Sequence, residues 1–289
     1  MRTIVFGDTG GHAIPFFAAL QNLGIDPDEL IIPEGIQIVH LGDLIHKGPD
    51  SNIIIMVVNQ IMIRNPDRWH QILGNHEYNY IQGAPKFWRG ELNTEAWKIL
   101  QSWFHKKKAQ PAFYLPSTAS FLIPKSLRFD SSLLTGKGIL FTHAGVTRKF
   151  WKSIESPATA KLASEVINSL PVTQVAKPGI MLDSRGANPG PVWALSTDEV
   201  FNSWNFEEDN ELGNIDMPFV QVHGHTAGYY WRTRNWYNAS KQFREATKLS
   251  PENRVSYTKV ANSLQIGCDP AFSNTADLKV QPYFEITTP

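Results

Sequence analysis

The stretch "IVFGDTGGH", Ile4 to His12, places an aspartate in a glycine-rich turn directly after a short apolar run. Short apolar runs bounded by glycine are typical of buried strands, so we expect a strand over Thr3–Phe6 and a helix over His12–Asn22. Asp8 would then stand where the strand ends. The stretch alone is compatible with a metal site, a phosphate-binding turn or a plain strand-to-helix turn.

The same alternation continues along the first 80 residues. Strands are expected over Ile36–Leu41 and Trp69–Leu73, with a helix over Asn52–Ile63 between them. Strands that alternate with helices indicate βαβ units and a parallel or mixed sheet. A helix over Thr94–His105 and a hairpin made by Ala112–Tyr114 and Ser120–Ile123 should follow.

The second half of the chain is richer in strands. We expect them over Gly138–Thr142, Phe219–His223, Tyr229–Arg232, Arg254–Val260, Leu264–Gly267 and Gln281–Ile286, with a helix over Thr159–Leu170. The sequence therefore predicts an α/β protein with two sheets packed on one another and helices outside. Lys177–Pro191, rich in glycine and proline, is expected to be a surface loop, and residues 1–289 are expected to form one domain.

Composition excludes several classes of protein. Of the 289 residues 42% are hydrophobic and 19% charged, and the 27 basic side chains balance the 27 acidic ones. This balance gives no field that would favour nucleic acid or an anionic membrane, and the basic run His105–Lys108 is interpreted as a solvated helix end. No signal peptide or membrane-spanning run is recognised, and Cys268 is the single cysteine. We expect a soluble protein of the cytoplasm.

Chemistry-bearing side chains follow five of the predicted strands. They are Asp8, then Asp43, His46, Lys47 and Asp50 in "GDLIHKGPD", Asn75, His76 and Glu77 in "GNHE", His143 in "HAG", and His223 and His225 in "HGHT". In open α/β sheets, ligands bind in the crevice beyond the carboxyl ends of the strands. Each motif alone could be a turn, a helix cap or a buried histidine, but five in succession favour a site.

This set mixes carboxylate, amide and imidazole ligands. Such a set suits Mn²⁺, Fe or Zn²⁺ better than Ca²⁺, which prefers oxygen alone. It is large enough for two ions bridged by a carboxylate, an arrangement that clamps a phosphoryl group during an in-line displacement. The residues therefore predict metal-assisted chemistry on a phosphate ester.

In this order "GDLIHKGPDS", "GNHE", "HAG", "GHT" and the late "LQIGCD" (Leu264–Asp269) resemble the motifs of the calcineurin-like metallophosphoesterases. The likeness is greatest to their serine/threonine phosphoprotein phosphatase branch. The resemblance implies two mixed β-sheets sandwiched between helices, with a dinuclear centre at one edge. Two divalent ions are expected there, Mn²⁺ in the first place, with Fe, Zn²⁺ or Ni²⁺ as alternatives.

The resemblance also implies roles for the ligands, position by position. Asp43 would bridge the two metals, Asp8 would serve the first metal, and the second would be held by Asn75, His143 and His225. His223 has no counterpart in the family motif and is expected outside the site.

The acid of the reaction is implied in the same way. His76 would be the general acid or electrostatic stabiliser near the leaving oxygen, with Glu77 as the partner of its imidazole. A water acidified by the ions would attack phosphorus.

The first motif departs from the family pattern. Gly10 stands where the family has a histidine, and His12 follows two residues later. We expect His12 to replace the missing ligand; the alternative is that it lies outside the site and the first metal lacks a protein ligand.

Several positions that carry family charges are also altered. Lys47 replaces an arginine and His46 the aspartate before it, while Leu73 and Leu195 stand where further arginines are expected. Lysine keeps a charge for phosphate but loses the bidentate fork. Arg185 could compensate, so the phosphate is expected to meet Lys47, Asn75, His76 and Arg185.

An aromatic cluster, "YYWRTRNWY" over Tyr229–Tyr237, closely follows "HGHT". It could stack a base or line a protein groove. The alternative, which we favour, is that these side chains alternate between the core and a solvated face.

The function expected from the sequence is that of a metal-dependent phosphoesterase acting on phosphomonoesters of protein or nucleotide. A dinucleoside polyphosphate or phosphodiester hydrolase is the alternative, because the altered arginines would weaken the grip on a dianionic phosphate. A catalytically weak metal-binding module is the second alternative, which Gly10 favours and His76 disfavours.

Overall fold

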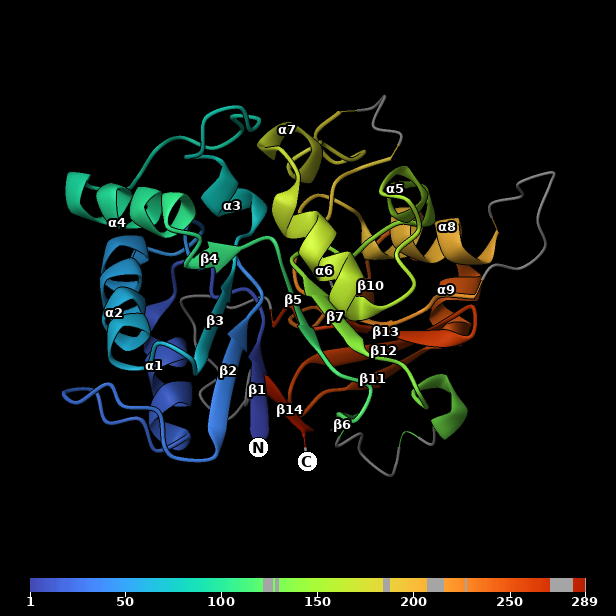
Figure 1. Ribbon diagram of the computed structural model, residues 1–289, viewed down its shortest axis with the longest axis horizontal. Coiled ribbons are helices and arrows are strands. Elements are labelled where there is room, and N and C mark those ends of the chain that lie inside the picture. The colour runs from blue at the N-terminus through green and yellow to red at the C-terminus, as the bar shows by residue number, and fades with distance from the viewer. Residues whose placement is uncertain are drawn as a thin grey trace.

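The computed structural model describes residues 1–121, 127, 130–183, 188–206, 216–226, 228–270 and 283–288. Two six-stranded sheets pack against each other, and helices cover their outer faces (Figure 1). Both sheets mix parallel and antiparallel pairs. This confirms the predicted α/β architecture of two mixed sheets flanked by helices.

The first sheet is built mainly from the N-terminal part of the chain. Its order is β4-β3-β2-β1-β14-β6, and the first four strands run parallel. The strands are β1 (Arg2–Phe6), β2 (Ile36–His40), β3 (Trp69–Ile72), β4 (Ala109–Gln110), β6 (Ser120–Phe121) and β14 (Tyr283–Thr287). Strand β14 lies antiparallel between β1 and β6, so the last strand of the sequence pairs with the first.

The second sheet has the order β11-β12-β13-β8-β7-β5. Its strands are β5 (Ala112–Leu115), β7 (Ile139–Thr142), β8 (Val220–His223), β11 (Thr247–Ser250), β12 (Val255–Val260) and β13 (Ser263–Gly267). The central strands β13, β8 and β7 are parallel and the outer ones antiparallel. A separate two-stranded ribbon joins β9 (Tyr229–Tyr230) to β10 (Asn235–Trp236).

Helices form where apolar side chains recur with helical spacing. In α2, Ile54, Ile55, Val58, Ile61 and Met62 are buried on one face. The α-helices are α1 (Ala13–Asn22), α2 (Ser51–Arg64), α3 (Asn75–Tyr78), α4 (Thr94–His105), α5 (Arg148–Ser153), α6 (Ala160–Ser169), α7 (Val172–Val175), α8 (Asn202–Asn205) and α9 (Lys241–Ala246). A 3₁₀ helix, η2 (Ser131–Leu133), and a π-helix, η3 (Ser196–Phe201), are also present. None of the helices in the described part of the chain is long and apolar enough to cross a bilayer.

Three apolar clusters hold the layers together. One packs α1, α2 and α4 on the first sheet, another packs α5, α6, α8 and α9 on the second, and the third lies between the sheets. In the third, Val5 and Val39 of the first sheet meet Phe141 and Val222 of the second, all of them fully buried. This packing fixes the two sheets face to face. It thereby also fixes the relative positions of the loops that follow their strands.

The predicted hairpin of Ala112–Tyr114 and Ser120–Ile123 is wrong. Strand β5 pairs with β7 in the second sheet, whereas β6 pairs with β14 in the first. The long-range pairing buries Leu115 opposite Ile139 in the core between the sheets, a gain that local sequence cannot reveal. Within Tyr229–Arg232 only Tyr229–Tyr230 forms a strand, and Thr247–Ser250 is an additional one. Ile123, Gln281 and part of Lys177–Pro191 lie outside the described residues.

Candidate metal centre

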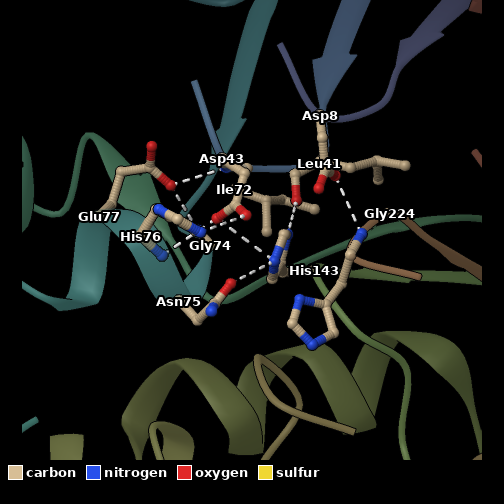
Figure 2. Close-up of polar contacts among 12 residues, drawn as sticks. Asp8, Leu41, Asp43, Ile72, Gly74, Asn75, His76, Glu77, His143 and Gly224 are labelled. Carbon is tan, nitrogen blue, oxygen red and sulfur yellow. Dashed lines mark hydrogen bonds and ion pairs between the residues drawn. The ribbon is translucent and has the colours of Figure 1, made fainter. Parts of the chain in front are cut away.

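Loops that follow parallel strands of both sheets meet at one place (Figure 2). They bring together Asp8 after β1, Asp43 after β2, Asn75 and His76 after β3 and His143 after β7. His225, after β8, lies with Asp43 and His143. Backbone hydrogen bonds between the loops fix this convergence, for example from Gly224 N to the carbonyl of His143 at 2.8 Å. Glu77, His12 and Arg185, which the sequence also predicted for the site, are described separately below.

Asp43, His143 and His225 form the densest part of the site. One ligand atom from each lies within 4.8 Å of the others. Asp43 Oδ1 is 3.4 Å from His143 Nε2, and both side chains are almost completely buried. A carboxylate and two imidazoles at this spacing can ligate one divalent cation.

The orientation of His143 leaves its ligating nitrogen free. Its Nδ1 lies 2.8 Å from the carbonyl oxygen of Leu41, which can only accept, so Nδ1 carries the proton (Figure 2). Nε2 therefore presents a lone pair towards Asp43 and Asn75. Metal-binding histidines are commonly oriented by a backbone carbonyl in this way.

The side-chain amide of Asn75 lies among these ligands. Its Oδ1 is 2.9 Å from His143 Nε2, so two lone pairs face each other, as they do when both atoms bind a cation. With the amide turned over, its nitrogen donates to the Asp43 carboxylate at 3.2 and 3.3 Å and to His225 Nδ1 at 3.3 Å. In either orientation Asn75 is directed into the cluster.

Asp8 lies on the other side of the same cluster and keeps an unused oxygen. Its Oδ1 accepts a 2.9 Å hydrogen bond from the backbone N–H of His225. Within the described part of the chain, Asp8 Oδ2 and His225 Nε2 are buried without a hydrogen-bond partner. Burial, Asp269 and Asp43 raise the pKa of Asp8 well above its usual range. Buried acceptors and crowded carboxylates are costly, and a divalent cation would satisfy both. The donor set therefore fits a metal.

Glycines let the backbone approach the ligands closely. A Cβ atom at Gly74 would lie 2.1 Å from Asp43 Oδ1, and one at Gly224 would lie 2.3 Å from Asp8 Oδ1. Asp43 and His225 themselves adopt left-handed backbone conformations, with φ of 53° and 59°. Such strain at non-glycine residues is characteristic of functional sites, where surrounding contacts maintain it.

Glu77 does not pair with the imidazole of His76, and this prediction is wrong. Its carboxylate accepts three backbone hydrogen bonds of 2.8 Å, from Asp43 and Gly74 to Oε2 and from Leu44 to Oε1. Burial and the charge of Asp43 raise the pKa of Glu77 to about 8, and the three N–H groups oppose that shift. Glu77 thus clamps the loop after β2 to the loop after β3.

The partner of His76 is instead His46. Their Nδ1 atoms are 2.6 Å apart, and His46 Nε2 is 2.7 Å from the hydroxyl of Tyr80. On its other side, His76 Nε2 faces Asp43 Oδ2 at 3.7 Å. Sequence reasoning noted His46 as a substitution but missed this contact and missed Tyr80. The sequence did contain a signal for this contact. His46 replaces a family aspartate in the motif "GDLIHKGPD", which precedes the motif "GNHEYNY" that contains His76 and Tyr80.

Lys47 supplies positive charge to the site. Burial disfavours its ammonium group, yet Asp8, Asp43 and Asp269 outweigh that effect and raise the pKa of Lys47 above its usual value. Its side chain passes beside Gly10, where a Cβ would lie 3.5 Å from Lys47 Cδ. The space left by the missing family histidine is thus bordered by this lysine.

The other two residues predicted for the site are His12 and Arg185. His12 precedes α1, is 6% exposed and has its Nδ1 close to Gly48, and the three-residue cluster does not include it. Its role as a ligand stays a prediction. Arg185 lies outside the described residues.

His223 has no ring nitrogen to offer. Its Nδ1 and Nε2 are each 2.9 Å from a partner, the carbonyl of Gly224 and the side chain of Gln265. This agrees with its expected place outside the site.

Aromatic rings border the cluster. Trp88 stacks on His46 at 5.2 Å between ring centroids, and Trp193 lies edge-on to His225 at 6.0 Å. By contrast, Tyr229 and Trp236 of the aromatic cluster pack on each other, and Trp236 packs on the buried Phe243. Tyr230 is half exposed, so the cluster alternates between core and solvent as favoured from the sequence.

The chain was compared with known families, curated sequences and solved structures. The sequence profile of the family described as calcineurin-like phosphoesterase matches residues 1–256. No curated protein sequence matches the chain. Among solved structures, the cold-active protein-tyrosine phosphatase of a psychrophilic Shewanella species is similar, with a TM-score of 0.48 and 14% identity over 96% of this chain and 72% of that one. A protein provisionally assigned as a diadenosine tetraphosphatase gives a TM-score of 0.40 and 14% identity over 93% of this chain and 83% of that one.

Proposed function

Because the chain belongs to the calcineurin-like phosphoesterase family of hydrolases, we propose that it is a metal-dependent phosphomonoesterase acting on phosphorylated protein or nucleotide. The observation that carries this proposal is that ligand atoms of Asp43, His143 and His225 lie within 4.8 Å of one another, beside Asp8 Oδ2 and His225 Nε2, buried atoms for which the described part of the chain supplies no hydrogen-bond partner. A site built only for stability would pair these groups with one another.

Two divalent cations, Mn²⁺ in the first place, are proposed as cofactors. Asp43, Asn75, His143 and His225 would hold one of them. Asp8 would hold the other together with Asp43, with His12 as the candidate further ligand. When bound, such ions neutralise the charge of a phosphoryl group and acidify the attacking water.

The protein's own side chains would bind and orient the substrate. Lys47, kept charged by the carboxylates around it, would attract the phosphoryl group. His76 would present its Nε2 to the leaving oxygen from the side of the cluster that Asp43 borders. Asn75 would complete the phosphate contacts once its amide nitrogen faces the substrate.

A phosphodiester or dinucleoside polyphosphate hydrolase is the second candidate. Leu73 and Leu195 are buried apolar residues at positions where the family resemblance implied arginines. A site whose phosphate charge is met mainly by Lys47 and the metals suits a monoanionic diester better than a more cationic site would.

The test compares Mn²⁺-dependent hydrolysis of p-nitrophenyl phosphate, bis-p-nitrophenyl phosphate and diadenosine tetraphosphate, with a chelator control. We expect turnover on the monoester that requires metal and is lost in His143→Ala. Greater kcat/KM on the diester or the dinucleotide would favour the second candidate. No turnover on any of the three with Mn²⁺, Fe²⁺, Zn²⁺ or Ni²⁺ would refute both.

A further inference from the structure

His76 stands at the end of a short series of hydrogen bonds that leads away from the metal centre. Its Nδ1 contacts His46 Nδ1 at 2.6 Å, and His46 Nε2 contacts the Tyr80 hydroxyl at 2.7 Å. His46 is fully buried and His76 is 5% exposed, so water does not compete for these contacts. Each hydrogen bond must therefore have one donor and one acceptor among these three groups.

Tyr80 determines which group donates and which accepts in each of these hydrogen bonds. Its oxygen accepts a 3.1 Å hydrogen bond from the backbone N–H of Glu91, and the backbone N–H of Leu92 acts on it as well. Two donors occupy the lone pairs of the oxygen, so its one proton is free to be donated to His46 Nε2. Burial raises the pKa of Tyr80, which keeps that proton in place at neutral pH.

His46 accepts a hydrogen bond at one ring nitrogen and donates one from the other. Burial lowers the pKa of His46 to about 3, so the ring is neutral and carries a single proton. Because Nε2 accepts from Tyr80, the proton sits on Nδ1 and is donated to His76 Nδ1. The orientation of His46 is held by Trp88, stacked on it at an interplanar angle of 11°, and by its backbone N–H, which donates to Ser51 Oγ at 2.9 Å.

Because His76 Nδ1 accepts the hydrogen bond from His46 Nδ1, it carries no proton, and the ring proton of His76 lies on Nε2. That nitrogen faces Asp43 Oδ2 at 3.7 Å, and a carboxylate on this side favours an N–H there. Both ends of the series thus select the same tautomer of His76.

We propose that Tyr80 and His46 are positioning residues that hold His76 as its Nε2–H tautomer, with that proton directed into the metal centre where the ester oxygen of the substrate would leave. The role in turnover rests on the proposed function, whereas the tautomer does not. A histidine and a tyrosine here do what a single carboxylate would do, but without adding negative charge beside Asp43.

A positioned proton matters most for poor leaving groups. A p-nitrophenolate leaves without help, whereas an alkoxide leaves only if it gains a proton or a strong hydrogen bond. Tyr80→Phe keeps the ring and removes only the hydroxyl. We expect it to lower kcat on an alkyl phosphomonoester about 10–100-fold, and on p-nitrophenyl phosphate less than about 3-fold, since general acid catalysis is worth roughly 100-fold or more. His46→Gln should show the same selectivity with a larger loss. Tyr114→Phe, in strand β5 away from the site, is the matched control and should change neither rate.

The tautomer can be measured without activity. In metal-free protein labelled with ¹⁵N-histidine, the His76 signals, assigned with His76→Gln, should show a protonated Nε2 and an unprotonated Nδ1. In Tyr80→Phe the donor to His46 is lost, so the His76 signals should move towards a mixture of tautomers. Tyr114→Phe should leave the spectrum unchanged.

A His76 protonated on Nδ1 in the parent protein would overturn the proposal. So would a Tyr80→Phe variant with an unchanged spectrum and an equal loss of rate on both esters. If the parent showed the expected spectrum but hydrolysed no phosphate ester, the tautomer assignment would stand and the proposed function would fall.

Discussion

The carboxylate of Asp8 accepts a 2.9 Å hydrogen bond from the backbone N–H of His225, although 217 residues separate them in the chain. Asp8 ends a strand of one sheet and His225 follows a strand of the other. The contact therefore joins the two halves of the site. In the described part of the chain, Asp8 Oδ2 and His225 Nε2 are both buried without a hydrogen-bond partner. A cation bound there should couple to the stability of the whole fold.

Metal should therefore stabilise the protein against unfolding. A ligand at about 100 times its Kd adds about 2.7 kcal/mol, so saturating Mn²⁺ should raise the Tm by several degrees. The measurement is thermal unfolding with Mn²⁺ and with a chelator. Asp43→Asn should abolish the difference, while Asp28→Asn, in an exposed turn, should retain it. Equal melting curves with and without metal in the parent protein would contradict the assignment of the site.

Gly74→Ala should damage the metal centre. The added methyl group would lie 2.1 Å from Asp43 Oδ1, far inside van der Waals contact, so the carboxylate must move. We expect loss of bound Mn²⁺, measured as metal content after dialysis, and at least a 100-fold loss of kcat/KM, since an ångström of misplacement costs about that much. Gly90→Ala is the control, because its nearest neighbour, Tyr80 Cε1, would lie at 3.8 Å. Full metal content in Gly74→Ala would show that the close approach is dispensable.

Glu77→Gln should lower the free energy of unfolding, because Glu77 is buried and accepts hydrogen bonds from the backbone. One carboxylate oxygen becomes an NH₂ group that faces backbone N–H donors, leaving a buried donor of Asp43, Gly74 or Leu44 without an acceptor. Such a loss costs about 1–3 kcal/mol. Urea unfolding of the metal-free protein measures it, with Glu95→Gln on the exposed first turn of α4 as the control. A variant as stable as the parent would mean that Glu77 does not clamp the two loops.

His40 should make the stability depend on pH. Burial lowers its pKa to about 3, whereas in the unfolded chain a histidine titrates near its ordinary value of about 6.5. Between these values the unfolded state binds a proton that the folded state does not, so stability is present above about pH 6.5 and is lost as the pH falls. At pH 5 the loss from this one group is about 2 kcal/mol.

The measurement is urea unfolding at pH 7 and pH 5 with a chelator present, for the parent and for His40→Gln. The variant should lose about 2 kcal/mol less than the parent over this interval. His105→Gln, exposed at the end of α4, should behave as the parent does. The same slope in His40→Gln would exclude His40 as a source of the pH dependence.

Local sequence predicted an element correctly where the pattern of apolar residues within the segment was itself characteristic of a strand or a helix. The strand at Thr3–Phe6, the helix within Asn52–Ile63 and the strand at Gly138–Thr142 were all recognisable, because apolar periodicity is a property of neighbouring residues. The hairpin of Ala112–Tyr114 and Ser120–Ile123 was predicted wrongly, because β5 and β6 pair with strands of different sheets, and local sequence does not determine pairing between distant strands.

The residues of the site divide in the same way. The sequence by itself determined that Asp8, Asp43, Asn75, His143 and His225 each closely follow a strand, because a polar side chain near a glycine after an apolar run can be recognised from local sequence. Only the tertiary structure decided what each polar group contacts: that Glu77 clamps backbone N–H groups, that His76 faces His46, and that Tyr80 lies behind them both. Hydrogen bonds depend on distance and direction over a few ångströms, and those are fixed only when the two sheets have packed.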